Sequence, residues 1–219
     1  MSINEVLSRK VSFESEGETL FASLYNDTLE AVILCPPHPL RGGNRKDPRL
    51  VRVARDLSSN DISALCIDYG TYGGGFKEVQ NVLDAVSFMQ KRVSSLGLLG
   101  YSFGSVVASN AATKNGIGGF VGLSILKKVG NLMARLDFDC PKLFVHGKFD
   151  DIAPFSEFEQ LYAEAREPKE KMVLDAGHFY MENYPITMNL ASKRILEFFK
   201  EVFSRGRAQN KHGELRRIP

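Results

Sequence analysis

The residues best suited to covalent chemistry lie at positions 100–104, which read Gly-Tyr-Ser-Phe-Gly. A short apolar run at 96–99 precedes them, and a run of mostly small residues follows at 105–112. A serine at a sharp strand-to-helix turn has an exposed hydroxyl, and flanking glycines let the backbone crowd there. This context predicts that Ser102 is a nucleophile. The five residues alone would equally suit a structural turn at the end of a buried strand.

A serine hydroxyl needs a base to take its proton, and histidine is the usual base. Three of the four histidines, His38, His146 and His178, follow predicted strands, whereas His212 lies near the end of the chain. Ligands bind outside the carboxyl ends of parallel strands, so location does not separate the first three. The order nucleophile, acid, base along the chain favours His178, because it leaves room for an acid between. The alternative is a structural histidine that holds a loop.

The acid must orient the histidine and stabilise its charged form. Asp150 is the best candidate, because it follows a predicted strand in the segment His-Gly-Lys-Phe-Asp-Asp at 146–151. Its neighbour Asp151 is the main rival, and we expect it to cap a helix or turn instead. Asp175 is a weaker rival, since it is only three residues from His178. We expect His146 to bond loop backbone rather than to take part in catalysis.

A tetrahedral oxyanion needs two N–H donors. The backbone N–H of Phe103, at the start of a helix, is the first candidate. The second should come from the loop after the strand at 31–35, where the prolines at 36, 37 and 39 have no backbone N–H. We therefore predict the amide of Leu40 as the second donor and that of His38 as the alternative. Without catalysis, the same prolines would only make a rigid surface loop.

Five side chains near these loops are expected to contact a substrate: His38, Arg41, Tyr72, Tyr101 and Phe179. Arg41 or Arg45 could attract an anionic substrate, and a solvated basic surface is the alternative reading. The glycines at 70–75 match neither the dinucleotide-binding fingerprint nor the phosphate-binding loop of nucleotide hydrolases.

The composition is that of a globular chain of one domain: 219 residues, 43% of them hydrophobic. A net charge of +2 does not favour a nucleic-acid partner. No run approaches the length needed to cross a membrane, and residues 1–6 do not resemble a signal peptide, so we expect a cytoplasmic protein. The three cysteines, Cys35, Cys66 and Cys140, lack metal-ligand spacing and are expected to be reduced thiols.

Predicted strands alternate with predicted helices, which favours a mostly parallel sheet with helices on both faces. The predicted strands are 11–13 and 20–25 (a hairpin), 31–35, 62–67, 96–99, 119–123, 143–145 and 172–174. The predicted helices are 49–57, 77–93, 105–112, 156–165 and 186–203. We expect one domain over residues 1–203 and a basic mobile tail over 204–219.

Four segments together resemble the α/β-hydrolase superfamily, and most of all its small dienelactone-hydrolase-like serine hydrolases and esterases. They are Pro-His-Pro-Leu-Arg-Gly-Gly-Asn at 37–44, the serine turn at 100–104, His-Gly-x-x-Asp-x-x-x-Pro at 146–154 and Gly-His-Phe at 177–179. The resemblance covers residues 10–203 and implies an α/β-hydrolase fold with a Ser102–His178–Asp150 triad. One departure is the glycine-rich loop at 68–75, which replaces an arginine-containing loop of the family and is expected to border the pocket.

The resemblance implies a serine hydrolase that cleaves a small-molecule acyl substrate, a carboxylic ester or thioester, through an acyl-enzyme and without metal or cofactor. The short spacings between Ser102, Asp150 and His178 leave room for at most a short cap over 124–138, so we expect an open site for small acyl groups. The serine nucleophile argues against dienelactone itself, for which relatives use cysteine. A peptidase or acyltransferase, or a ligand-binding module without catalysis, are the alternatives on the same fold.

Overall fold

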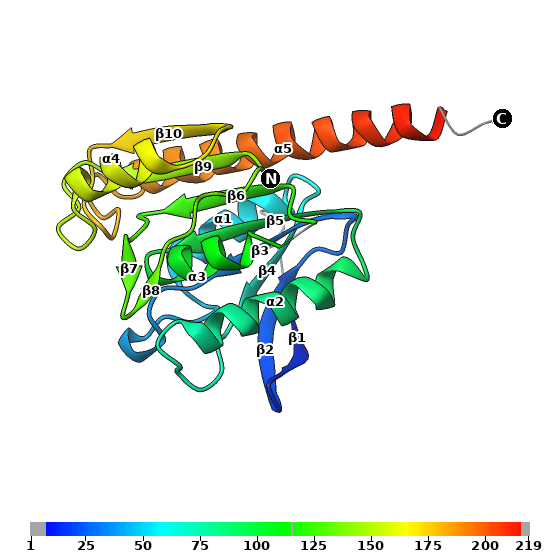
Figure 1. Cartoon of the computed structure of the whole chain (residues 1–219), viewed down its shortest axis with the longest axis horizontal. Coiled ribbons are helices and arrows are strands. Elements are labelled where there is room, and N and C mark those ends of the chain that lie inside the picture. The colour runs from blue at the N-terminus through cyan, green and yellow to red at the C-terminus, as the bar shows by residue number, and fades with distance from the viewer. Residues whose placement is uncertain (1–7, 115, 216–219) are drawn as a thin grey trace, which may run out of the picture.

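The structure, a computed structural model, describes residues 8–114 and 116–215 and has a single large sheet at its centre (Figure 1). Its strands are β1 (Ser8–Ser15), β2 (Glu18–Tyr25), β3 (Glu30–Cys35), β4 (Ser63–Ile67), β5 (Ser95–Tyr101), β6 (Gly119–Leu123), β9 (Lys142–Gly147) and β10 (Lys169–Leu174). They lie in the order β1-β2-β4-β3-β5-β6-β9-β10. From β4 to β10 all neighbours are parallel. The predicted mostly parallel sheet is confirmed.

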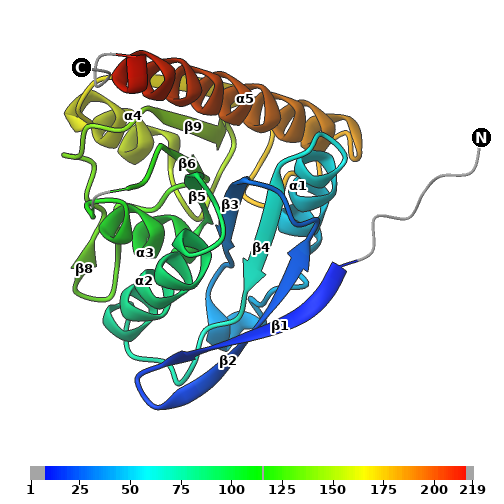
Figure 2. The ribbon, with the colours of Figure 1, turned by 90° about the vertical axis from the view of Figure 1, so that its right-hand side faces the viewer.

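The predicted N-terminal hairpin is also confirmed. β1 and β2 pair antiparallel from Ser15 opposite Glu18 outward, and β2 pairs antiparallel with β4. The turn between them needs left-handed backbone at Glu16 (φ 48°) and Gly17 (φ 81°), and glycine adopts this conformation at no steric cost. The hairpin bends away from the rest of the sheet (Figure 2).

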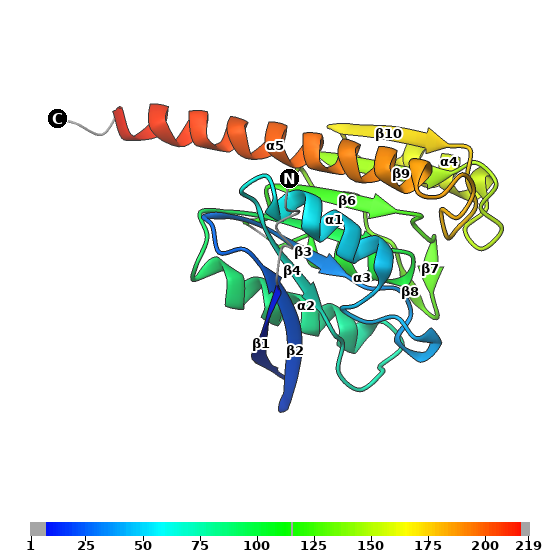
Figure 3. The same ribbon diagram turned by 180° about the vertical axis from the view of Figure 1, so that it is seen from behind.

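The central strands are apolar on both faces, because helices cover both sides. One face carries α1 (Pro48–Ser58) and α5 (Ile186–Leu215), which pack on one group of buried residues. The other face carries α2 (Phe76–Gln90), α3 (Phe103–Ala111) and α4 (Phe155–Glu164), which pack on a second group. Figure 1 shows α2 and α3 in front of the sheet, and Figure 3 shows α1 on the opposite side.

The segment 124–138, expected to form at most a short cap, contains a small hairpin of β7 (Lys128–Val129) and β8 (Leu132–Met133). The hairpin is tied to α3, because the side-chain amide of Asn110 donates to the carbonyl of Met133 at 2.9 Å. Its side chains Val129 and Leu132 also pack against Gly75, at the start of α2. The hairpin therefore thickens the α2–α3 side of the molecule.

The closing helix is longer than predicted. α5 runs from Ile186 to Leu215, whereas the apolar pattern predicted a helix over 186–203. Residues 204–215 contain no proline and include helix-favouring types such as arginine, alanine, glutamine, lysine and glutamate, so the helix does not stop where its apolar stripe ends. Most of the predicted tail is thus helical, and its mobility stays a prediction. The rest of that tail, 216–219, and the N-terminal residues 1–6 lie outside the described residues.

Among the residues that the structure describes, no helix is both long enough and apolar enough to cross a membrane.

Candidate active site

Ser102 lies on the turn that joins β5 to α3, and its backbone is strained. Its dihedral angles are φ 55° and ψ −119°, in a region that costs a non-glycine residue about 1–3 kcal/mol. The turn is possible because two glycines flank it. A Cβ on Gly100 would lie 2.2 Å from the carbonyl oxygen of Gly104, and a Cβ on Gly104 would lie 2.2 Å from the carbonyl oxygen of Cys35. These close approaches seat the helix start directly on β3 and β5.

Phe103 is the first residue of α3. The first N–H groups of a helix have no acceptor within the helix, and the helix dipole places partial positive charge there. The N–H of Ser102 itself donates to the carbonyl of Leu123 at 2.9 Å, so the turn is also anchored to the end of β6. The Phe103 amide is thereby held next to the Ser102 hydroxyl.

Strand register brings the later loops to Ser102. Tyr101 lies opposite Leu123, Leu123 lies opposite Val145, and Gly147 lies opposite Leu174. The carboxyl ends of β5, β6, β9 and β10 therefore form one row at the same edge of the sheet. The loops after β9 and β10, which carry the predicted acid and base, start beside the serine.

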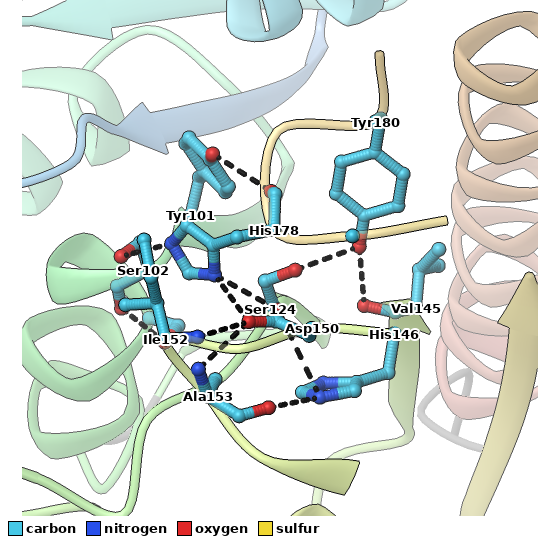
Figure 4. A network of polar contacts seen from close by, with 12 residues as sticks. Tyr101, Ser102, Ser124, Val145, His146, Asp150, Ile152, Ala153, His178 and Tyr180 are labelled. Atoms are coloured by element: carbon cyan, nitrogen blue, oxygen red, sulfur yellow. Dashed lines mark hydrogen bonds and ion pairs between the residues drawn. The ribbon is translucent and has the colours of Figure 1, made fainter. Parts of the chain in front are cut away.

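His178 bridges the other two predicted residues (Figure 4). Its Nε2 lies 2.8 Å from the Oγ of Ser102, and its Nδ1 lies 2.8 and 2.9 Å from the two carboxylate oxygens of Asp150. Only 3% of His178 is exposed. The hydroxyl of Tyr101 donates to the His178 carbonyl at 3.0 Å, which fixes the backbone that carries the imidazole. The structure thus brings Ser102, His178 and Asp150 into one hydrogen-bonded series.

Asp150 is held as a carboxylate by its own loop. Its Oδ1 accepts from the backbone N–H groups of Ile152 (3.0 Å) and Ala153 (2.7 Å). Burial acts to raise the pKa of Asp150, but the hydrogen bonds from His178 and Ala153 outweigh it and hold that pKa below its usual range. The turn-capping role expected of Asp151 therefore belongs to Asp150, while Asp151 is exposed. Asp175, the weaker rival, is also exposed.

His146 binds the backbone of the loop that carries Asp150, as expected of a structural histidine. It is fully buried, its ring stacks on Phe158 with centroids 4.2 Å apart, and its Nε2–H donates to the carbonyl of Ala153 at 2.8 Å. Burial lowers the pKa of His146, which favours a neutral ring. The pair of bonds at Ala153, one to its N–H and one to its carbonyl, fixes the turn that presents Asp150.

A second buried group braces the far side of Asp150 (Figure 4). The hydroxyl of Tyr180 donates to the carbonyl of Val145 at 3.1 Å and lies 3.0 Å from the hydroxyl of Ser124. Either hydroxyl can donate in the contact between Ser124 and Tyr180, and the Ser124 side chain is also one of the hydrogen-bonding groups that lower the pKa of Asp150. Sequence reasoning did not find Ser124 or Tyr180, although Ser124 directly follows the predicted strand 119–123 and Tyr180 lies two residues after the predicted base His178.

A cavity of about 210 Å³ opens onto Ser102 and His178. It is lined by Pro37, His38, Arg41, Gly42, Gly43, Asp47, Arg49, Tyr101, Ser102, Ile152, His178 and Phe179. Four of the five predicted substrate contacts are in this set: His38, Arg41, Tyr101 and Phe179. Neither the glycine-rich loop at 68–75 nor the segment 124–138 contributes a lining residue, so the expectation that the glycine-rich loop borders the pocket is wrong for this cavity.

Two predicted residues do not reach the cavity. The N–H of Leu40 donates to Nδ1 of His38 at 3.2 Å within their own turn, and the Leu40 side chain is 70% exposed. Its amide is thus occupied rather than aimed at Ser102. Tyr72 does not line the cavity but packs against the ring of His38, which does, with ring centroids 5.0 Å apart.

His38 is packed at the cavity wall between Tyr72 and Phe103, whose ring centroid is 4.7 Å away. Burial, and then the charge of Arg41, lower the pKa of His38. The bond from Leu40 occupies Nδ1, so a neutral His38 ring carries its proton on Nε2.

Sequence reasoning missed two charged residues of the cavity, Asp47 and Arg49. Asp47 caps α1 by accepting from the N–H groups of Arg49 (3.0 Å) and Leu50 (3.4 Å), and its carboxylate also pairs with the Arg49 guanidinium. The Asp47-Pro48 pair is a helix-start signal that could have placed Arg49 in the first turn, next to the strand ends.

Cys35 and Cys66 are buried free thiols, as expected, and Cys140 is a partly buried one. Within residues 8–114 and 116–207, whose side chains the structure describes, no group of three or more His, Cys, Asp or Glu could hold a metal ion.

No protein-family model and no curated protein sequence matches this chain. Comparison with solved structures is informative. The chain is similar to an α/β serine hydrolase homologue from Coxiella burnetii, with a TM-score of 0.77 and 18% identity over 86% of this chain and 97% of that chain. It is also similar to Est1E from Butyrivibrio proteoclasticus, with a TM-score of 0.76 and 18% identity over 89% of this chain and 99% of that chain.

A third similar structure is an α/β serine hydrolase without a lid from Xanthomonas campestris, with a TM-score of 0.71 and 14% identity over 94% of this chain and 97% of that chain. At these identities the likeness concerns the fold. The chain has the α/β-hydrolase fold, as its sequence motifs predicted.

Proposed function

We propose that this chain is a serine hydrolase that cleaves small carboxylic esters or thioesters through an acyl-enzyme on Ser102. The observation that carries the proposal is the hydrogen-bonded series in which His178 contacts Ser102 through Nε2 and Asp150 through Nδ1. A neutral imidazole with its proton on Nδ1, facing the carboxylate, has its Nε2 lone pair directed at the serine hydroxyl. The fold and the similar hydrolase structures support the same reading.

In the proposed mechanism, the Ser102 oxygen attacks the substrate carbonyl carbon while Nε2 of His178 takes the hydroxyl proton. Asp150 stabilises the imidazolium that forms, since its own pKa stays low. The carbonyl oxygen becomes an oxyanion, for which we propose the backbone N–H groups of Phe103 and His38 as donors. His38 replaces Leu40 in this role because His38 lines the cavity and the Leu40 amide is already bonded.

The intermediate then collapses. The bond to the leaving alcohol or thiol breaks as His178 returns its proton to that group, which leaves the acyl group on Ser102. A water molecule attacks this acyl-enzyme while His178 again acts as the base, and the acid product leaves with Ser102 restored. Every proton in this cycle moves through groups of the chain itself.

A small substrate suits the cavity. Its volume of about 210 Å³ is below the range of about 300–1,000 Å³ that is common for drug-sized ligands. Its apolar wall is formed by Ile152 and Phe179, which are 43% and 51% exposed. We therefore propose short acyl groups rather than long lipid chains.

Labelling with a fluorophosphonate tests the proposal, because this probe reacts with activated serines. The wild-type protein should be labelled on Ser102, as identified by peptide mass, and Ser102→Ala should not be labelled. The same variant should lower kcat for p-nitrophenyl esters of short acyl chains at least about 10³-fold. Ser204→Ala, which changes an exposed serine on α5, is the matched control and should keep both properties. Absence of labelling and turnover in folded wild-type protein would overturn the proposed function.

A further inference from the structure

Two arginines face the cavity that opens onto Ser102, and one carboxylate accompanies them. Arg41 and Arg49 both line the cavity, and Asp47 is the only acidic residue among its lining residues. The charged side chains of the wall therefore sum to a net positive charge. A wall of this kind favours a ligand group of opposite sign, since part-enclosed charges are less screened than those on open surface.

Arg49 is held in a fixed plane with donors to spare. Its Nε donates to Oδ1 of Asp47 at 2.9 Å, and its Nη2 pairs with the other carboxylate oxygen. The guanidinium carbon lies 4.6 Å from the ring centroid of Tyr101 and 5.5 Å from that of Phe179. A guanidinium has five N–H groups, and these two bonds use only two of them. The Nη1 group has no acceptor among the described residues.

Arg41 differs from its neighbour Arg45. The backbone N–H and guanidinium of Arg45 are both bonded to Asp68, and Arg45 does not line the cavity. Arg41 lines the cavity and has no ion pair with a residue that the structure describes. Of the two arginines that the sequence offered for an anionic substrate, the structure thus leaves Arg41 available and adds Arg49.

We propose that the natural substrate carries a carboxylate, which Arg41 and the free edge of Arg49 hold while Ser102 attacks the ester carbonyl. This inference rests on the proposed function and names the substrate class of the same site. Guanidinium groups bind carboxylates through short, paired, charge-assisted hydrogen bonds, so they suit this task better than a lysine would. The carboxylate could belong to the acyl part or to the alcohol part of the ester.

Two matched pairs of esters distinguish these positions. For the acyl part, monoethyl glutarate is compared with its terminal amide, which is nearly isosteric and uncharged. For the alcohol part, 3-carboxyphenyl butyrate is compared with 3-carbamoylphenyl butyrate. In one of the two pairs, the charged ester should have a kcat/KM at least about tenfold higher than its neutral partner. That preference should shrink as sodium chloride rises to about 0.5 M.

Variants tie the preference to the two arginines. Arg41→Gln and Arg49→Gln should each reduce the charged-to-neutral ratio of kcat/KM by about fivefold or more, mainly through KM of the charged ester. Arg52→Gln is the matched control. Arg52 lies on the same helix as Arg49 and pairs with Asp56 outside the cavity, so its loss should leave the ratio unchanged.

The outcomes separate this inference from the proposed function. If neutral esters are hydrolysed but neither charged ester is preferred, the carboxylate proposal is wrong and the hydrolase proposal stands. The carboxylate proposal is also wrong if the preference exists but survives both arginine variants. If folded protein hydrolyses none of the four esters and is not labelled by the fluorophosphonate, the proposed function fails and this inference fails with it.

Discussion

At the scale of single residues, His178 is constrained on both sides of its ring and at its backbone. Asp150 holds Nδ1, Ser102 contacts Nε2, and the hydroxyl of Tyr101 binds the His178 carbonyl. The carboxylate selects the tautomer with a proton on Nδ1, because a low pKa keeps Asp150 an acceptor. The imidazole therefore needs no rearrangement before it accepts a proton.

Exchange of Asp150 for asparagine should show how much this selection matters. Asp150→Asn keeps the shape but can present an N–H to Nδ1, which favours the wrong tautomer, so kcat should fall about 10³- to 10⁴-fold. Asp151→Asn changes an exposed neighbour and should alter kcat by less than about twofold. Steady-state kinetics on one short-chain ester measures both. A larger loss of kcat in Asp151→Asn than in Asp150→Asn would instead identify Asp151 as the acid of the triad.

The burial of His146 should make the stability of the protein depend on pH, without affecting the chemical step. Burial lowers its pKa, so on acidification the unfolded chain takes up this proton before the native protein does. The free energy of unfolding should therefore begin to fall below the ordinary histidine pKa of about 6.5, by at most about 1.4 kcal/mol per pH unit for this group. The fall ends once native His146 is also protonated.

Urea unfolding followed by circular dichroism between about pH 7.5 and 5 measures this effect. His146→Phe keeps a ring on Phe158 but cannot titrate, so its stability should depend less on pH than that of the wild-type protein. Equal pH dependence in the two proteins would show that His146 titrates normally in the fold.

Single residues also mark how far the site could be predicted. Ser102, Asp150 and His178 could be placed together because each lies within five residues after the end of a predicted strand, and the carboxyl ends of parallel strands lie side by side. Leu40 could not be judged in this way, because a hydrogen bond to the neighbouring His38 ring takes its amide, and no spacing reveals such a bond. Arg49 was missed because its approach to Tyr101 depends on how α1 packs.

At the scale of elements, the close contact between α3 and the sheet is the feature on which the serine turn depends. Gly104→Ala would place a Cβ 2.2 Å from the Cys35 carbonyl oxygen and 2.4 Å from that of Pro36, neither of which can move freely. We expect a loss of about 2 kcal/mol or more in the free energy of unfolding, with reduced kcat.

Gly206 provides the control within the same chain. It lies inside α5, and a Cβ there would have no atom within 4 Å. Gly206→Ala should therefore leave stability unchanged or raise it by up to about 1 kcal/mol, since alanine favours helix. Thermal unfolding of both variants checks the pair. Similar effects at the two positions would contradict the close packing described for Gly104.

Buried strands and long amphipathic helices could be predicted from the sequence, because apolar runs and helical stripes mark them. The strands β7 and β8 could not, since each has only two residues and their pairing depends on contact with α3. The end of α5 was also misplaced. Among the residues whose burial is described, Phe203 is the last buried one, but the helix continues to Leu215, so the apolar stripe and the helix end at different residues.

At the scale of the whole molecule, α5 runs from the carboxyl ends of the strands back to their amino ends. It begins after the loop that carries His178, and Arg207 near its other end pairs with Glu30, the first residue of β3, at 2.7 Å. Arg207 therefore lies at the amino ends of the strands, away from Ser102, and α5 extends beyond the sheet from there (Figure 3). Changes there should not reach the cavity.

Removal of residues 204–219 tests this separation. The ion pair of Arg207 is lost, but that side chain is 60% exposed, so the free energy of unfolding should fall by no more than about 1 kcal/mol. Turnover should stay within about twofold. Removal of residues 198–219 is the contrasting variant: it also deletes the buried Phe198, Phe199 and Phe203 and should prevent folding. A large loss of turnover on removal of residues 204–219 alone would show that this segment is part of the folded domain.

The order of strands along the chain has a consequence for biosynthesis. Ser102 leaves the ribosome long before β9 and β10, yet His178 comes only after β10, the outermost strand on that side. Under the proposed function, a nascent or half-folded chain carries an inert alcohol and becomes a hydrolase only when its last strand docks. Appearance of esterase activity would then time the final folding step, independently of any spectroscopic probe.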